Sequence, residues 1–202
     1  QRQMCIRDRP EYPEQNRHLS KVGHPMQAHQ VLVAEGLFTS QEQIDNSPEQ
    51  KFGTYYVGDI KYKDVNDDGV VDANDYVWND TPYIPEIMYG FGSTIKYKAW
   101  DFQFMFQGTG NYQIRMYDHH PFCTSANSGF GIVQYIADNH WSWDNNRADA
   151  EYPRLTSIAS DNNTQASTYY LRKANYLRLK SLEIGYSIRN FRIYVAGSNL
   201  FT

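Results

Sequence analysis

Two stretches of the sequence decide the fold: IMYGFGSTIKYKAWDFQFMFQ, residues 87–107, and SLEIGYSIRNFRIYVAGS, residues 181–198. In both, large apolar side chains recur at every second position, and small, polar or charged residues stand between them. A period of two indicates strands. The breaks at residues 98–100 and 189–190 are short enough for tight links between antiparallel neighbours. The two stretches therefore predict four antiparallel strands in two pairs.

Each predicted strand has one apolar face and one small or polar face. The apolar faces carry Ile87, Tyr89, Phe91, Ile95 and Tyr97; Phe102, Phe104 and Phe106; Leu182, Ile184, Tyr186 and Ile188; and Phe191, Ile193 and Val195. Just before the third strand, Leu177 and Leu179 stand at odd positions, whereas Leu182 and Ile184 stand at even ones. In a regular strand they would therefore lie on opposite faces. A one-residue bulge near Lys180 would restore the alternation. Alternatively, that half of the strand lies beyond a membrane, where the apolar face is no longer specified.

The composition excludes several classes of protein. The chain has 202 residues, with 19 Lys+Arg against 23 Asp+Glu, and no basic block of the kind that binds nucleic acid. No apolar run approaches the ~18 residues of a membrane helix. Aromatic residues make up 15% of the chain, which argues against intrinsic disorder. The composition does not exclude a membrane β-barrel, because its alternating strands give only a weak hydropathy signal.

The long segment between the two strand pairs, about residues 108–174, is polar and rich in Asn, Asp, Ser and Gly. A loop of this length is unusual in a compact domain but typical of the extracellular side of an outer-membrane barrel. Within it, residues 132–139 are expected to form a short helix. Trp141, Trp143 and Tyr152 either pack this loop against itself or stack on sugar rings.

The N-terminal third contains weaker signals. Residues 31–37 suggest a short strand. Ser40 and Gln43 resemble a capping box that starts one helical turn, which residues 46–48 would end.

Both ends of the chain look incomplete. Residues 1–9 carry charges where a signal peptide has its apolar region, so we expect a non-native or unassigned leader. The last residues, 199–202, lie inside an apolar strand-like run, so we expect truncation at both ends. Cys5 and Cys123 are too few for a disulfide scaffold, although a single bridge between them stays open.

The most specific motif is DVNDDGVVDAND, residues 64–75. It presents side-chain oxygens at positions 1, 3, 5, 9 and 12, and a backbone carbonyl at position 7, in the spacing of a Ca²⁺-binding loop. The ligands would be Asp64, Asn66, Asp68, Val70, Asp72 and Asp75, with Gly69 at the sharp turn. The last ligand is Asp and not the Glu of EF-hands, which favours modest affinity. The alternative is a metal-free turn in which the Asx side chains bond their own backbone.

Other constellations are weaker. Asp118-His119-His120 is more typical of a solvated loop than of a metal site, since adjacent His side chains point apart on an extended chain. No nucleophile elbow, Walker loop or zincin motif is present, and no carboxylate pair stands out as catalytic. The residues therefore mark no active site.

Two architectures fit the strand pattern. A secreted β-sandwich would bury the apolar faces in a core between two sheets. A membrane β-barrel would turn them to lipid and the polar faces to a wet lumen. Tyr supplies 17 residues, and an excess of Tyr and Trp is typical of the aromatic belts at membrane interfaces, which favours the barrel.

Several further blocks follow one another along the chain. They are Gly23-His24-Pro25, Glu35-Gly36-Leu37-Phe38, Gly58-Asp59-Ile60-Lys61-Tyr62-Lys63-Asp64, Tyr89-Gly90-Phe91-Gly92, Tyr152-Pro153-Arg154-Leu155, Asn175-Tyr176-Leu177-Arg178-Leu179-Lys180-Ser181-Leu182, Gly185-Tyr186 and Ser198-Asn199-Leu200-Phe201-Thr202. In this order, from about residue 22 to the end, the sequence resembles the C-terminal part of the barrel in SusC/RagA-type TonB-dependent outer-membrane transporters. Residues 1–9 and 26–30 depart from the family pattern.

The resemblance implies an all-β fold, an antiparallel transmembrane β-barrel segment with long extracellular loops, as part of a ~22-stranded barrel. Residues 10–202 would be a partial barrel, truncated at both ends, and residues 64–75 a structural calcium loop. The resemblance also implies a nutrient importer of the Gram-negative outer membrane, commonly for oligosaccharides and sometimes for peptides, without catalytic residues. The implied partners are a SusD-like surface lipoprotein, outer-membrane lipid and, through a region N-terminal to this segment, the TonB system.

Two rival interpretations remain. One is a secreted β-sandwich carbohydrate-binding module with a structural calcium loop. The other is a glycosidase fragment, which would need two carboxylates ~5–9 Å apart in a cleft. The apolar face discriminates the first rival from the barrel. In a sandwich it meets a second sheet, and in a barrel it forms an exposed belt about as tall as the hydrocarbon core of a bilayer.

Overall fold

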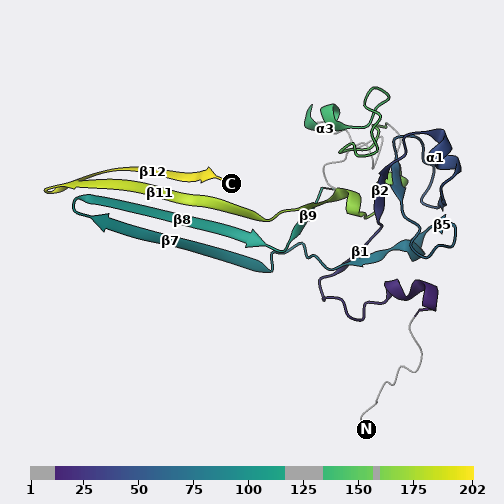
Figure 1. Ribbon diagram of the computed structural model, residues 1–202, viewed down its shortest axis with the longest axis horizontal. Helices are drawn as coiled ribbons and strands as arrows, with labels where there is room; N and C mark the ends of the chain where they lie inside the picture. The colour runs from purple at the N-terminus through teal and green to yellow at the C-terminus, as the bar shows by residue number, and fades with distance from the viewer. Residues whose placement is uncertain (1–11, 117–133, 157–159) are drawn as a thin grey trace, which may run out of the picture. The chain divides into compact units, whose positions relative to one another are not determined.

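The computed structural model describes residues 12–116, 134–156 and 160–202 (Figure 1). The predictions for the leader at residues 1–9, for Cys5 and Cys123, for Asp118-His119-His120 and for residues 132–133 lie outside the described residues. Within the described ranges, strands predominate, most strand pairs are antiparallel, and the helices are short. The chain divides into an N-terminal unit (Gln1–Asp80 and Arg115–Leu171) and a sheet unit (Thr81–Ile114 and Arg172–Thr202).

The sheet unit contains the four predicted strands. They are β7 (Ile87–Tyr97), β8 (Trp100–Gly110), β11 (Tyr176–Ile188) and β12 (Phe191–Phe201). They form one antiparallel sheet in the order β12-β11-β8-β7, and Figure 1 shows the four long strands running alongside one another. The prediction of four antiparallel strands in two hairpins is confirmed.

Two tight turns close the hairpins. Each consists of two residues, Lys98-Ala99 and Arg189-Asn190. The first residue of each turn has a positive φ, 55° at Lys98 and 49° at Arg189. A left-handed residue at this position suits the right-handed twist of the flanking strands. Trp100, which the sequence placed in the link, is instead the first residue of β8.

The predicted bulge lies in β11. The register of β11 against β8 shifts between Leu179 and Ser181, so Lys180 is the extra residue. The shift places Leu179 opposite Phe106, on the same face as Leu182. The change of parity is therefore absorbed within the sheet, and the alternative of a strand that has left its apolar surroundings is not needed to explain it.

The N-terminal unit is built from short strands. Their bounds are β1 (His29–Val31), β2 (Ala34–Leu37), β3 (Glu49–Gln50), β4 (Ile60–Tyr62), β5 (Val70–Val71) and β6 (Val77–Asn79). The pairs β1–β6 and β2–β4 are antiparallel, and β3–β5 is parallel. A further pair joins β9 (Gln113–Arg115) and β10 (Leu171–Lys173), and four of its six residues belong to the sheet unit.

The strand expected over residues 31–37 is divided into two. Leu32 lies between β1 and β2, and its backbone bonds another segment: its N–H donates to the Ala166 carbonyl at 2.8 Å, and its carbonyl accepts from the Thr168 N–H at 2.9 Å. These bonds replace the ladder of a continuous strand at this point. The interruption depends on a partner that is distant in the sequence, which local alternation does not reveal.

The helices are short. They are η1 (Glu14–Leu19), α1 (Gln41–Asp45), η2 (Ala73–Asp75), α3 (Gln134–Asn139), η4 (Asn162–Thr164) and η5 (Thr168–Tyr170). The start of α1 is capped as predicted, because Ser40 Oγ accepts from the Gln43 N–H at 3.3 Å. The Gln43 side chain accepts in return from Thr39 N, one residue before the N-cap. Among the described residues, no helix is long and apolar enough to cross a membrane.

The core of the N-terminal unit draws on distant parts of the sequence. It contains Leu32, Leu37, Ile60, Tyr62, Val71, Trp141, Ala150 and Tyr170. The last three belong to the segment, residues 108–174, that the sequence indicated as a long polar loop. That segment therefore supplies core residues as well as solvated ones.

A polar network is buried beside this core. Asp59 is fully buried, and its Oδ1 lies 2.8 Å from Arg154 Nε and accepts from Asn163 Nδ2 at 2.8 Å. Its Oδ2 accepts from the Tyr56 backbone N–H at 2.8 Å. Such a paired and hydrogen-bonded carboxylate is tolerated away from water. The network fastens the segments around Arg154 and Asn163 to the start of β4.

Candidate functional site

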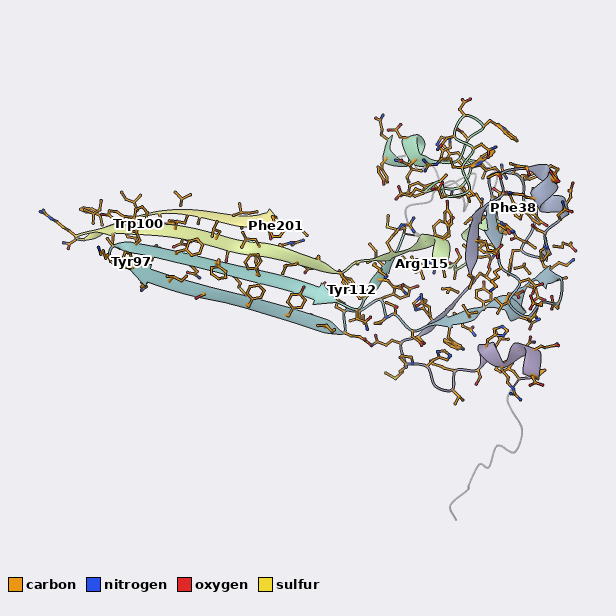
Figure 2. The ribbon with its side chains drawn as sticks, viewed as in Figure 1. Phe38, Tyr97, Trp100, Tyr112, Arg115 and Phe201 are labelled. Carbon is orange, nitrogen blue, oxygen red and sulfur yellow. The ribbon has the colours of Figure 1, made fainter. Side chains whose placement is uncertain are left out.

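One face of the four-stranded sheet is continuously apolar. Residues that pair across strands share a face, so the register carries the alternation of each strand into rows across the sheet. One such row consists of Ile95, Phe102, Ile184 and Val195. Rings also contact one another on this face: Phe91 stacks on Phe106 with centroids 5.0 Å apart. Figure 2 shows the side chains standing out from both faces of the strands.

The apolar face is open. Phe191 is 77% exposed and Val195 is 76% exposed. A contiguous apolar patch of more than a few hundred Å² is rare on a soluble monomer. Among the described residues of the sheet unit, no second sheet packs on this face. The sheet unit thus lacks the two-layer core of a β-sandwich.

Aromatic side chains with a polar group occupy the margins of this face. Trp100 and Tyr186 lie together at the end with the hairpin turns, with ring centroids 4.7 Å apart, and Tyr97 pairs with Trp100. Toward the other end, Tyr89 lies over Gly108, where an added Cβ would overlap the phenol ring. Tyr and Trp above and below an apolar band are typical of a protein surface that spans a lipid bilayer.

The opposite face carries an ion cluster. Arg192 in β12 donates through Nε to Asp101 Oδ1 in β8 at 3.2 Å, and its Nη2 contacts both Asp101 and Glu183 in β11. Gly185 leaves the space for this contact, because an added Cβ would lie 2.6 Å from Arg192 Nη2 and from the Asp101 carboxylate. One guanidinium therefore links three adjacent strands. The polar parity of these residues was visible in the sequence, but their convergence was not.

The Asp-rich loop, residues 64–75, holds itself together through side-chain to backbone hydrogen bonds. Asp64 Oδ2 accepts from the Gly69 N–H at 2.8 Å, and Asp68 Oδ1 accepts from the Val70 N–H at 3.0 Å. Gly69 has a φ of 86°, which is the sharp turn that position 6 was predicted to make. Asn66 Oδ1 accepts from the Asp68 N–H at 3.1 Å.

The end of the loop is closed by Asp75, which is fully buried. Its Oδ1 accepts from the Val65 N–H at 2.7 Å, and its Oδ2 accepts from the Asp72 N–H at 2.7 Å. Asp72 caps η2 by accepting from the Asn74 N–H at 2.7 Å. In the part of the chain that the structure describes, no group of three or more His, Cys, Asp or Glu side chains is arranged to hold a metal. The six predicted ligands thus form a hydrogen-bonded turn, and their metal binding stays a prediction.

Two titratable side chains of the N-terminal unit have shifted pKa values. Burial raises the pKa of the Tyr76 hydroxyl, and the charge of Arg115 opposes that shift. Burial lowers the pKa of His29, against the effect of its hydrogen bond to the Gln27 backbone, and Arg115 lowers it further. Both groups are therefore neutral near pH 7, and Tyr76 donates to Gln165 Oε1 at 2.9 Å.

The three aromatic residues of the long segment have different environments. Trp141 is 3% exposed and Tyr152 is 4% exposed, so both pack within the N-terminal unit. Trp143 is 74% exposed. The alternative of self-packing therefore holds for two of the three residues, and the sequence contained no signal that separated them.

Comparison with curated proteins identifies two relatives, although no family model matches the sequence. TonB-dependent receptor P26 of Formosa agariphila is 33% identical over 179 residues, which are 82% of this chain and 17% of that protein. TonB-dependent receptor P3 of the same organism is 28% identical over 130 residues, which are 58% of this chain and 12% of that protein. The chain therefore spans less than a fifth of the length of either relative.

Solved structures give the same picture of the fold. The RagAB peptide importer in the open-open state matches with a TM-score of 0.52 at 20% identity, over 86% of this chain and 18% of the other. The RagAB peptide transporter matches with a TM-score of 0.57 at 18% identity, over the same shares of both chains. At these identities the structural likeness establishes the fold alone. Together with the curated relatives, it confirms the resemblance read from the sequence: the chain belongs to the TonB-dependent receptors.

Proposed function

We propose that this chain forms part of the wall of an outer-membrane β-barrel in a TonB-dependent nutrient importer. The observation that carries the proposal is the open apolar face of the β12-β11-β8-β7 sheet, with an ion cluster on its other face. Lipid would cover the apolar face, and the wet lumen would solvate the Arg192 cluster. The protein would act by transport and would have no catalytic residues.

The dimensions of the strands suit a membrane. β7, β8 and β12 each have 11 residues and β11 has 13, whereas a tilted strand needs about 9–11 residues to cross the hydrocarbon core. β7 and β12 are the edges of this sheet. In lipid every backbone polar group needs a partner, so both edges would pair with neighbouring strands of a ~22-stranded barrel.

The cargo and partners follow from the family. Both curated relatives are named TonB-dependent receptors, and RagAB is named a peptide importer. By analogy we propose a nutrient cargo, an oligosaccharide or a peptide, at the outer membrane of a Gram-negative cell. A SusD-like surface lipoprotein would cover the barrel, and the TonB system would supply energy through the N-terminal part of the whole receptor.

Uptake by the full-length receptor tests this proposal. Cells that carry the receptor should import a labelled oligosaccharide or peptide, and a deletion of TonB should abolish the import. The receptor should also be recovered in the outer-membrane fraction and should migrate differently on a gel before and after boiling, as a folded barrel does. Recovery as a soluble secreted protein would contradict the proposal and support a β-sandwich carbohydrate-binding module.

We also propose that residues 64–75 bind a structural Ca²⁺ through Asp64, Asn66, Asp68, Val70, Asp72 and Asp75. Support comes from the spacing of the hard oxygen ligands. Asp64 and Asp68 each accept a backbone N–H and keep further lone pairs that a cation could use. Millimolar calcium should raise the melting temperature of the receptor. Asp64→Ala with Asp68→Ala should remove that rise and lower surface display without altering cargo preference. No response to calcium, or an altered cargo range with normal folding, would contradict this role.

A further inference from the structure

Trp143 is an unusual surface residue. It is 74% exposed, whereas Trp141, two residues before it, is 3% exposed and belongs to the core. Large aromatic side chains usually gain stability by burial. A tryptophan that the described residues leave uncovered is therefore a candidate contact for a ligand.

The loop that carries Trp143 is braced at several points. The Trp141 N–H donates to the Tyr152 carbonyl at 2.8 Å, and Trp141 Nε1 donates to Asn146 Oδ1 at 3.1 Å. Asn145 Nδ2 donates to the His140 carbonyl at 3.1 Å. Asn146 Nδ2 also reaches out of the loop and donates to the Thr39 carbonyl at 3.2 Å. The position of the Trp143 backbone is thus defined before any ligand arrives, which reduces the entropy lost on binding.

The ring of Trp143 lies against the buried ring of Trp141. It meets the ring of Trp141 edge to face, with centroids 5.1 Å apart and an interplanar angle of 66°. Trp141 in turn lies against Gly58, where an added Cβ would overlap its six-membered ring. These contacts, from Gly58 through Trp141, hold the exposed ring of Trp143 in a defined position and orientation.

The surroundings of Trp143 are polar. Asp144, Asn146, Arg147 and Asp149 are all exposed, and Arg147 pairs with Asp149 at 3.2 Å. Asp144 forms no hydrogen bond or ion pair with any residue in the described ranges, so its carboxylate is free to accept. The core of a stable protein–protein interface needs several apolar anchors. One exposed aromatic face next to one unpaired carboxylate, that of Asp144, suits a sugar ring better, because a pyranose offers C–H groups on its face and hydroxyls at its edge.

We propose that Trp143 and Asp144 form a binding platform for one pyranose ring of a neutral oligosaccharide. The sugar face would stack on the indole of Trp143, and two neighbouring hydroxyls would donate to the carboxylate of Asp144. This inference rests on the proposed function and narrows it, because it assigns a saccharide, and not a peptide, to this surface of the importer.

Binding by the full-length receptor in detergent tests the platform. The probes are maltohexaose, cellohexaose, mannohexaose and xylohexaose, each titrated by calorimetry against the native receptor and its variants. At least one probe should bind, and Trp143→Ala should weaken it about tenfold, the scale of one lost ring contact. Trp143→Phe should recover most of the affinity, and Asp144→Ala should weaken binding severalfold. Tyr135→Ala, at another exposed aromatic residue of the same segment, should leave the affinity unchanged.

Three results would overturn the platform. They are the failure of all four hexasaccharides to bind the native receptor, native affinity in Trp143→Ala, and loss of a co-purifying lipoprotein from Trp143→Ala with saccharide binding intact. TonB-dependent uptake, measured in parallel, separates this inference from the proposed function. Peptide uptake that depends on TonB and is unaffected by Trp143→Ala would contradict the saccharide platform but support the proposed importer. Uptake that does not depend on TonB would remove the importer.

Discussion

The two units of this chain treat their aromatic residues in opposite ways. In the N-terminal unit, Tyr62 and Tyr170 are buried, and their hydroxyls donate to the carbonyls of Asn162 and Asn163 at 2.7 Å. In the sheet unit, the rings of the apolar face stand exposed. The first unit completes its own core with apolar contacts and internal hydrogen bonds. In the sheet unit, the strands pair with one another, but the apolar face is left uncovered by the described residues.

This difference fits the proposed barrel, in which the apolar face of the sheet unit contacts lipid. A unit in water must satisfy its buried polar groups internally, and the network around Asp59 does so. A sheet between lipid and a wet lumen needs an apolar side and a polar side, with no core between them. The negative mean hydropathy of the whole chain conceals this, because polar segments dilute the alternating strands.

Asp59→Ala tests whether the N-terminal unit depends on its internal polar network, and it should have the largest effect on stability. It leaves the Arg154 guanidinium and the Asn163 amide without their shared partner, and breaking a buried ion pair costs about 3–5 kcal/mol. Limited proteolysis of the full-length receptor should show cleavage in the N-terminal unit at lower urea concentrations. Asp149→Ala is the matched control, because the Arg147–Asp149 pair is exposed and such pairs contribute at most about 1 kcal/mol. Equal urea midpoints for the two variants would contradict the argument.

Val195→Lys tests whether the apolar face of the sheet unit contacts lipid. A lysine on the lipid side of a barrel strand costs about 2–4 kcal/mol near the middle of the bilayer. The neighbouring Ala196 pairs with Glu183 on the opposite face, so Ala196→Lys should fold normally. The measurement is the fraction of receptor that folds into lipid vesicles at increasing urea concentrations. If both variants fold equally well, the apolar face does not contact lipid.

Gly58→Ala sharpens the account of the N-terminal unit. The φ of Gly58 is 93°, and an added Cβ would overlap Trp141, so strain and overpacking act together. Gly23→Ala isolates the strain, because Gly23 has a φ of 96° and no atom within 4 Å of the added Cβ. The difference between the two variants should be about 1–3 kcal/mol, the cost of overpacking. Thermal melting followed by Trp fluorescence measures it, and identical melting temperatures would exclude a collision with Trp141.

Arg192→Lys should have the smallest effect. Lysine keeps the charge but loses the planar fork that reaches Asp101 and Glu183 together, so the three strands are held less firmly. The temperature at which the barrel unfolds on a gel should fall slightly. Arg189→Lys, in the hairpin turn, is the control and should not change that temperature. If Arg192→Lys and Asp101→Asn have additive effects, the two residues are not coupled.

The strands were predictable because their signal is local. Parity indicated a bulge near Lys180, since one extra residue is the smallest change that returns Leu179 to the face of Leu182, but it left open a strand end beyond the membrane. The register of β11 against β8 decided for the bulge. The end of β8 was underestimated, because beyond Gln107 the large apolar residues thin out while the ladder continues to Gly110. For the Asp-rich loop, the turn at Gly69 was predictable from spacing, whereas the burial of Asp75 was not.

By itself, the sequence determined the alternation and the two hairpins, because side-chain parity and turn residues act over a few positions. It also determined the family, through an ordered series of short blocks. Only the tertiary structure decided which polar groups meet. Asp59 and Arg154 are 95 positions apart, and Asp101 and Arg192 are 91 apart, so no local pattern joins either pair. The same holds for Trp143, which remains exposed because Trp141 and not Trp143 fits against the space that Gly58 leaves.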